Sequence, residues 1–222
     1  MRLGLDMGEH VELERAKSAD ELGLWAISVR GTAGVEMLRA ARIVECTQYV
    51  RVFVQVDLAA EHPVAIAEEL CVLDNLSNGR IAALVCGDAE PERFLILRDA
   101  LIGRSRNGVM IAPSPVQTDV PVWPLAPSAI ESSAVVESSP SKVAPTAGLL
   151  SPGIADLCGN LDEDRCTIDR WRDAGCTHLL VSWPGPVKVL VRHLLSRAAT
   201  VDFPEIVAEI ADRLDPVEPT QS

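Results

Sequence analysis

The sequence predicts an α/β protein in which parallel strands alternate with helices. Between residues 2 and 102, short apolar runs of strand length alternate four times with longer segments that carry apolar residues at helical spacing. Strand–helix units repeated at intervals of roughly 25 residues form parallel sheets joined by right-handed crossovers. The strand runs are apolar throughout, as in parallel strands that are covered on both faces. An open doubly wound sheet and a closed eight-stranded barrel both satisfy this pattern, and periodicity alone does not choose between them.

The expected elements of the first half are separated by short turns. Pro63 lies in the first turn of the third helix, where its missing N–H costs little. Asn78 and Gly79 form a turn that leads into the fourth strand. The expected strands cover residues 2–6, 24–29, 50–56 and 81–85, and the expected helices cover 11–22, 35–47, 63–73 and 91–102.

The second half is less regular, although we expect one domain to span residues 1–214. An irregular segment rich in Ser and Pro covers 128–153 and contains two short strand candidates, 134–137 and 142–150. The remaining elements are a strand at 120–125 despite its prolines, a helix at 162–174, a strand at 178–183, helices at 186–198 and 203–214, and a disordered tail at 215–222.

Composition and charge exclude several classes of function. The 222 residues are 48% hydrophobic and 23% charged, which is typical of a soluble globular protein. A net charge of −12 opposes nucleic-acid binding, because a protein must supply cations to replace the counterions of the phosphates. No apolar run reaches the ~18–20 residues needed to cross a bilayer, and the first residues lack the pattern of a signal peptide. We therefore expect a cytoplasmic protein with no nucleic-acid or membrane partner.

Neither a metal site nor a common catalytic motif is evident. None of the six cysteines forms a C-x-x-C pair, and most lie in apolar runs. Cys158, Cys166, Cys176 and His178 have no spacing typical of a zinc module, so we expect ordinary burial and no metal. The sequence also lacks a G-x-S-x-G elbow, a Walker A loop, an H-E-x-x-H helix and a G-x-G-x-x-G turn after the first strand.

One segment is specific enough to identify a resemblance. Residues 61–85 read EHPVAIAEELCVLDNLSNGRIAALV. This segment resembles the signature of the bacterial luciferase-like family of flavin-dependent monooxygenases and deazaflavin-dependent oxidoreductases, and weaker similarity extends along the chain. The matching residues are His62, Pro63, Ala67, Glu68, Leu73, Asp74, Leu76, Ser77, Gly79 and Arg80.

The resemblance implies a (β/α)8 TIM-type barrel. Such a barrel usually needs ~250 residues, so we expect a reduced barrel in which the helices around strands five to seven are eroded. In that barrel 134–137 and 142–150 are the sixth and seventh strands. Arg80 then enters the fourth strand at its N-terminal end, the face associated with stability, while Asp74 and Ser77 bind local backbone N–H groups.

The resemblance also implies a function. We expect a flavin- or deazaflavin-dependent oxidoreductase or monooxygenase with FMN or a deazaflavin coenzyme and an unidentified small organic substrate. The alternative is a catalytically degenerate barrel that binds flavin or serves as a partner subunit. Relatives pair through helices, so we expect a homodimer, or a heterodimer with a longer homologue. Its candidate contacts are Cys46, Ile66, Ala67, Leu70 and Leu73, which burial against the barrel explains equally well.

Barrel chemistry takes place at the carboxyl ends of the strands, so the candidate site residues are sought there. A flavin needs a flat apolar slot, hydrogen bonds to the ring edge and a cationic or N–H-rich group for its phosphate. A cavity on the order of 300 Å³ or more at this end would favour an enzyme. Packing in the core is the alternative role of the two tryptophans. The expected cofactor-binding residues are Trp123 and Trp183 for the slot, Ser28 and Gln55 for the edge, Arg30 for the phosphate, and the neighbouring Asp57 and Gly87; no catalytic residue is assigned.

Overall fold

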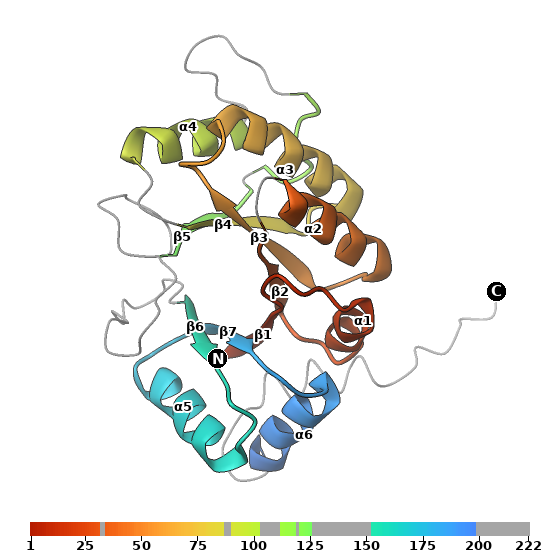
Figure 1. Ribbon diagram of the computed structural model, residues 1–222, viewed down its shortest axis with the longest axis vertical. Helices are drawn as coiled ribbons and strands as arrows, with labels where there is room; N and C mark the ends of the chain where they lie inside the picture. Colours follow the sequence, from red (N-terminus) through yellow and green to blue (C-terminus); the bar gives the residue numbers. More distant parts are fainter. Residues whose placement is uncertain (32–33, 87–89, 103–111, 119, 126–151, 199–222) are drawn as a thin grey trace, which may run out of the picture.

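The protein is built on one parallel sheet of seven strands in the part of the chain that the structure describes (Figure 1). The computed structural model describes residues 1–31, 34–86, 90–102, 112–118, 120–125 and 152–198, with side chains as far as 192. The strands are β1 (Arg2–Asp6), β2 (Ala26–Val29), β3 (Arg51–Asp57), β4 (Ile81–Cys86), β5 (Val122–Pro124), β6 (Pro152–Asp156) and β7 (His178–Ser182).

The strand order is that of a TIM-type barrel that stays open at one place among the described residues. The order β5-β4-β3-β2-β1-β7-β6 runs in sequence around the sheet, with the first and last strands of the chain paired. The sheet curls so that its edge strands, β5 and β6, lie on the same side of the molecule (Figure 1). The reduced α/β barrel expected from the resemblance is therefore confirmed as a fold class.

The seventh strand of the expected barrel is not where the sequence suggested. The strand that pairs with β7 is Pro152–Asp156, which begins inside the segment expected to be irregular up to residue 153. Proline and glycine obscured it, yet both suit an edge strand, where one side of the backbone has no ladder to complete. The strand candidates at 134–137 and 142–150, the helix at 203–214 and the tail lie outside the described residues.

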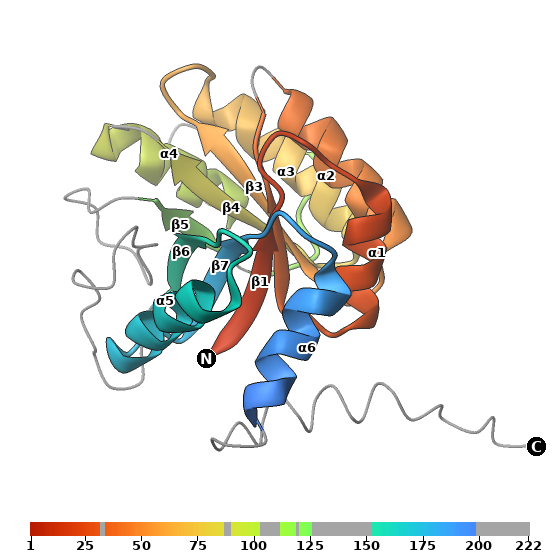
Figure 2. The same ribbon diagram turned by 60° about the horizontal axis from the view of Figure 1, so that its bottom comes forward.

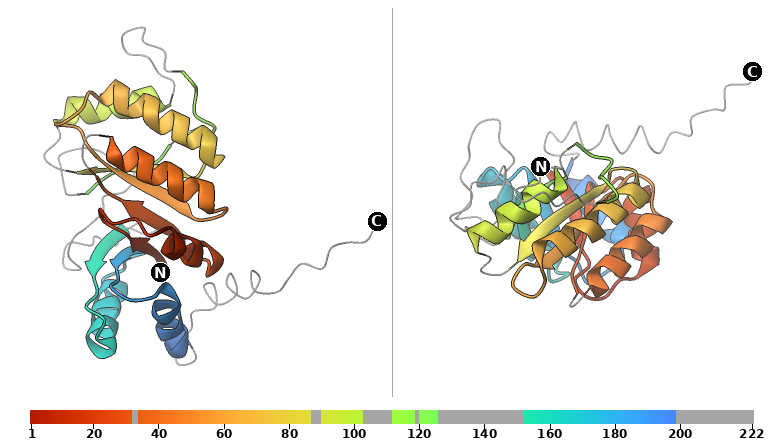
Figure 3. Two further views of the ribbon diagram at one scale, coloured as in Figure 1. Left: turned by 45° about the vertical axis from the view of Figure 1, so that its right-hand side comes forward. Right: turned by 90° about the horizontal axis from the view of Figure 1, so that it is seen from above.

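Six helices of the described residues cover the outside of the sheet, and each was expected from the periodicity of the sequence (Figure 2). Figure 3 shows α5 and α6 at the opposite end of the molecule from α3 and α4. None of the described helices is long and apolar enough to cross a membrane. The helices are α1 (Leu13–Glu21), α2 (Val35–Cys46), α3 (Pro63–Ser77), α4 (Pro91–Leu101), α5 (Leu161–Asp173) and α6 (Val187–Ala198).

Local chemistry explains the ends of α3 and α5. Nδ1 of His62 accepts a hydrogen bond from the Val64 N–H, and α3 runs to Ser77, four residues beyond its expected end. It stops where Asn78 and Gly79 adopt left-handed conformations, with φ of 56° and 84°, which confirms the expected turn. In α5, Asn160 caps the first turn, acids occupy that turn and arginines the last, as the helix dipole favours.

Arg80, a residue of the signature, stabilises the N-terminal side of the sheet. The Arg80 guanidinium donates to the carbonyl oxygens of Val44, Thr47, Val50 and Ser77 and to the Thr47 hydroxyl, at 2.9–3.1 Å. Arg80 therefore connects the turn after α2 to the start of β4. This structural role agrees with its expected position at the N-terminal face of the barrel.

Asp74 also has a structural role, but its partners are distant in sequence. Its buried carboxylate accepts hydrogen bonds from the backbone N–H groups of Val116 and Gln117 and from the Gln117 side chain. The expectation of a local role for Asp74 was therefore wrong, because this carboxylate ties α3 to the segment before β5. Ser77 does act locally, since its hydroxyl accepts a hydrogen bond from the Arg80 N–H.

An aromatic cluster fills the interior of the curled sheet. Trp25 lies 5.3 Å from Phe53, 5.9 Å from Trp123 and 4.4 Å from His178, measured between ring centroids. Phe53 and Trp123 are themselves 4.9 Å apart. These rings belong to a buried cluster inside the sheet, and a larger apolar core separates the sheet from the helices. These rings therefore fill the interior of the sheet below the carboxyl ends of its strands. Space for a ligand lies at those carboxyl ends.

Candidate cofactor site at the carboxyl ends of the strands

The register of the sheet brings polar side chains together at its carboxyl edge. Asp6, the last residue of β1, is paired with Ser28 on one side and with Ser182 on the other. Ser182 in turn is paired with Asp156 of β6. Since parallel strands end at the same edge, residues from four strands meet there although their positions in the sequence range from 6 to 182.

A buried carboxylate organises this edge. The Asp6 side chain is 1% exposed and accepts hydrogen bonds from the Ser28 hydroxyl at 2.6 Å and the Gly8 N–H at 3.2 Å. Its second oxygen accepts from the Arg30 guanidinium at 2.7 Å, and this hydrogen bond raises the pKa of Arg30. The Arg30 side chain is half exposed. Asp6 therefore positions a charged hydrogen-bond donor at the carboxyl ends of the strands, where a ligand can reach it.

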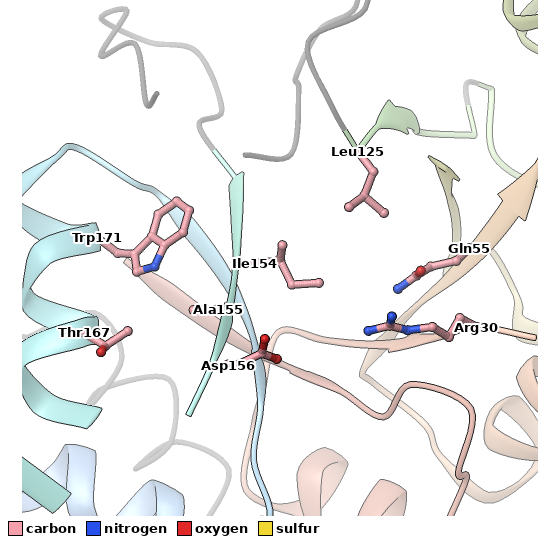
Figure 4. Close-up of a pocket in the computed structure, with 8 residues that line it drawn as sticks. All are labelled: Arg30, Gln55, Leu125, Ile154, Ala155, Asp156, Thr167 and Trp171. Atoms are coloured by element: carbon pink, nitrogen blue, oxygen red, sulfur yellow. The ribbon is translucent and has the colours of Figure 1, made fainter. Parts of the chain in front are cut away.

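Beside Arg30 lies a cavity of about 390 Å³ (Figure 4). Its volume is within the range of small-molecule sites and exceeds the 300 Å³ set as the criterion for a flavin ring. One side carries the polar ends of Arg30 and Gln55, while the other is formed by β6 and α5. The lining residues are Arg30, Gln55, Leu125, Ile154, Ala155, Asp156, Thr167 and Trp171.

The Gln55 amide is the most informative group in this cavity. Gln55 is only 7% exposed, and its Oε1 accepts a 3.4 Å hydrogen bond from the thiol of Cys86. Burial raises the pKa of this thiol to about 11, so it remains a neutral donor. The Gln55 Nε2 atom has no hydrogen-bond partner among the described residues, and Figure 4 shows it pointing into the cavity beside the Arg30 guanidinium. An unsatisfied buried donor is costly, and a ligand oxygen would satisfy it.

Trp171 forms the opposite wall and explains the glycine in β6. It is 2% exposed and packs its ring against Gly153. A Cβ atom at position 153 would lie 2.7 Å from Cε3 of this indole, closer than real Cβ contacts. Only glycine lets the edge strand approach the indole, and that contact holds α5 against the cavity.

Only some of the residues expected to bind a cofactor line the cavity. Arg30 and Gln55 line the cavity together. Ser28 is fully buried and is connected to Arg30 through Asp6. Asp57 is exposed and accepts a hydrogen bond from the Ala59 N–H at 2.8 Å, which stabilises the turn after β3.

The two tryptophans expected to form the flavin slot lie elsewhere. Trp123 packs on Phe53 in the interior cluster. Trp183 is also buried, and its indole N–H donates to the Pro186 carbonyl oxygen. Neither lines this cavity, in agreement with the alternative of core packing. Gly87 lies outside the described residues.

The sequence did not indicate the residues of the cavity wall formed by β6 and α5. Asp156, Thr167 and Trp171 line the cavity because the unrecognised strand β6 leads into α5. A signal was present, since the apolar Ile154 and Ala155 precede Asp156 as apolar residues precede Asp6 in β1. Leu125 was expected at the end of the fifth strand but not as a site residue.

The cysteine and histidine cluster weighed in the sequence does not come together as a metal site. Within the described residues, no group of three or more His, Cys, Asp or Glu side chains could hold a metal ion. Cys158 and Cys166 are exposed, and Cys176 is buried. His178 is partly buried against Trp25, and burial lowers its pKa to about 4.

Comparisons with known proteins identify the fold. No protein-family model and no curated protein matches the sequence. A coenzyme F420-dependent tetrahydromethanopterin reductase from Methanopyrus kandleri is similar in structure, with a TM-score of 0.64 and 12% identity over 88% of this chain and 97% of its own. MsnO8, solved without ligand, has a TM-score of 0.51 and 20% identity, over 83% of this chain and 62% of its own. The riboflavin lyase RcaE, solved with modified FMN and riboflavin, has a TM-score of 0.51 and 12% identity, over 78% of this chain and 66% of its own.

At these identities the comparisons establish the fold alone. The chain shares the fold of a reductase that depends on coenzyme F420 and of a lyase solved with modified FMN. It spans nearly the whole reductase but only about two thirds of the lyase and less of MsnO8.

Proposed function

We propose that the chain is a flavin- or deazaflavin-dependent oxidoreductase or monooxygenase that acts on a small organic substrate. The cavity at the carboxyl ends of the strands carries this proposal, because the Gln55 Nε2 atom, which has no partner among the described residues, is directed into it. Chemistry in barrels of this type takes place at that end. Two proteins of the same fold support the choice of cofactor, since one is named for coenzyme F420 and the other was solved with modified FMN.

The residues of the chain would bind and orient such a cofactor. When bound, a flavin or deazaflavin supplies the redox chemistry itself. Gln55 and Arg30 would donate hydrogen bonds to oxygen atoms on the polar edge of its ring. Leu125, Ile154 and Trp171 would supply apolar surface and exclude water from the ring.

The test is a titration of the purified protein with FMN and with a deazaflavin coenzyme, followed by visible absorbance. Micromolar binding with a perturbed spectrum is expected for one of them. Arg30→Met and Gln55→Leu should each weaken it at least tenfold, because each removes a donor from the cavity. The control is Arg51→Met, which removes an arginine from the N-terminal end of β3. No binding of either cofactor would refute the proposal.

A second candidate is a catalytically degenerate barrel that binds a flavin without turning over a substrate. It is favoured by the cavity lining, whose described residues include no histidine or cysteine and only one acid, Asp156. The rate at which oxygen reoxidises the reduced, bound cofactor separates the two candidates. An enzyme should change that rate by tenfold or more from the free cofactor, or do so when substrate is added, whereas a binding protein should not.

We also propose that two copies of the chain pair through α2 and α3. The contacts expected from the sequence at Ile66, Ala67, Leu70 and Leu73 are buried within the chain itself, so they would not contribute. Four other apolar side chains on these helices are exposed: Val35 at 41%, Leu38 at 68%, Val72 at 45% and Leu76 at 65%. Burying them between copies would remove apolar surface from water.

Sedimentation equilibrium tests the pairing. Leu76→Glu should raise the dimer dissociation constant at least tenfold. The matched control is Leu161→Glu, which changes another exposed leucine on α5, away from α2 and α3. A monomer at all concentrations, or equal effects of the two substitutions, would refute this interface.

A further inference from the structure

The two walls of the cavity differ in the chemistry that they offer a ligand. On one wall, the buried Gln55 Nε2 and the Arg30 guanidinium are hydrogen-bond donors that point into the space (Figure 4). On the other, Asp156 places a carboxylate at the end of β6. A ligand that satisfies both walls has acceptor oxygens on one edge and N–H or hydroxyl donors on another.

The charge of Arg30 is already balanced. Its guanidinium forms a 2.7 Å ion pair with the buried Asp6, and its pKa is raised by Asp6 first and by Asp156 more weakly. Arg30, the one cation among the described lining residues, is therefore matched by the Asp6 carboxylate behind it and faces the Asp156 carboxylate across the space. The net charge of these three groups is negative, which suits neutral acceptors better than an anion.

The charge becomes more negative beyond Asp156. A second, more open hollow of about 440 Å³ shares Asp156 and Thr167 with the cavity. The other charged residues that line it in the described part of the chain are Asp162, Glu163, Asp164 and Arg170, so acids outnumber bases among them. A phosphate extending from the cavity on this side would meet repulsion.

Apart from Thr167, the remaining described residues of the lining are apolar, and the cavity has room for a ring. Leu125, Ile154, Ala155 and the indole of Trp171 enclose the cavity, whose volume is near the low end of the range for small-molecule sites. An aromatic ring with carbonyl groups on one edge matches this combination of donors and apolar walls.

We infer that the cavity recognises the uncharged ring and the hydroxyl groups of a flavin, and that the phosphate adds nothing to the affinity. This inference rests on the proposed function and specifies which part of the cofactor the site binds. FMN should therefore bind no tighter than riboflavin. Gln55 and Arg30 bind the ring oxygens, and Asp156 accepts from a hydroxyl or N–H group.

Riboflavin and FMN test the inference directly because they share one ring and differ only in the phosphate. Dissociation constants are measured by quenching of flavin fluorescence in 10 mM and 300 mM NaCl. We expect FMN to bind no more than threefold tighter than riboflavin at either salt concentration. FMN affinity should rise with salt, because screening weakens the repulsion by acids, while riboflavin affinity should stay constant.

Asp156→Asn provides a second readout. It should increase FMN affinity about threefold in 10 mM NaCl and change riboflavin affinity less than twofold. Asp173→Asn is the matched control, because it removes the same charge at the far end of α5 and should change neither affinity. A purely structural role of Asp156 would alter both ligands equally and leave the salt dependence unchanged.

The outcomes separate this inference from the proposed function. FMN binding more than threefold tighter than riboflavin, or weakening with salt, would refute the inference while a flavin-binding function remained. The deazaflavin core and its phosphorylated coenzyme form the same kind of pair and are compared if neither flavin binds. Failure of all four ligands to bind at 1 mM would refute the inference and the proposed function together.

Discussion

Replacing Gln55 by leucine should stabilise the ligand-free protein while it weakens ligand binding. The side chain is 93% buried, its Nε2 has no partner among the described residues, and its Oε1 has one weak contact, the Cys86 thiol at 3.4 Å. Leucine has a similar size and no polar atoms, so Gln55→Leu removes an unsatisfied donor from the wall of the cavity.

The expected change in stability follows from one unsatisfied donor that is removed and one hydrogen bond that is lost. A buried donor without a partner costs roughly 1–3 kcal/mol, and the thiol contact that is lost is worth about 0.5 kcal/mol. Gln55→Leu should therefore increase the free energy of unfolding by about 1 kcal/mol. In a chain of 222 residues this corresponds to a rise in Tm of about 2–4 °C.

Gln117→Leu is the matched control, because the same substitution there removes an amide that has partners. The Gln117 Nε2 donates to Asp74 at 2.7 Å and to the Ile81 carbonyl oxygen at 2.8 Å. Since a hydrogen bond to a charged group contributes about 1.5–3 kcal/mol, Gln117→Leu should lower the free energy of unfolding by about 2–3 kcal/mol.

Urea unfolding followed by tryptophan fluorescence measures both substitutions, with and without riboflavin. At a hundred times its dissociation constant, the ligand should stabilise the original protein by about 2.7 kcal/mol. The same ligand concentration should stabilise Gln55→Leu by no more than about 1.4 kcal/mol, because its dissociation constant is at least tenfold higher. A decrease in stability for Gln55→Leu without ligand would show that the amide has a partner in the folded chain, and the reasoning would then be wrong.

Three further predictions concern the scaffold. Arg80→Met should lower the free energy of unfolding by about 3–4 kcal/mol in urea, because buried oxygens lose a charged donor, and a loss below 1 kcal/mol would contradict this role. Gly153→Ala should lower it by about 1–3 kcal/mol, and adding Trp171→Leu should remove most of that penalty; an unchanged penalty in the double variant would place the strain elsewhere. His178 has a pKa of about 4 through burial, Arg2 and the N-terminus, so the unfolded chain takes up its proton first as the pH falls from 6.5 to 4. Stability should decline by about 2 kcal/mol over that range, and His178→Phe should flatten the decline; an equal slope in both proteins would rule His178 out.

The sequence alone determined the fold class and indicated the two polar residues on one wall of the cavity. Strand and helix periods are local properties, because a buried strand or an amphipathic helix must repeat apolar residues at its own spacing. They located β1–β4 and the helices that follow them. Because parallel strands share one carboxyl edge, the sequence also indicated Arg30 and Gln55 as site residues.

Tertiary structure decided which strand ends form the cavity and what each polar group binds. Asp74 bonds to Val116 and Gln117, and no local pattern encodes a partner more than 40 residues away. β6 was hidden by its own composition, since Gly153 is required by an indole 18 residues further along the chain. Trp123 lies in the interior because the curl of the sheet brings Phe53 and Trp25 against it. Long-range packing, rather than local periodicity, therefore set the shape and charge of the site.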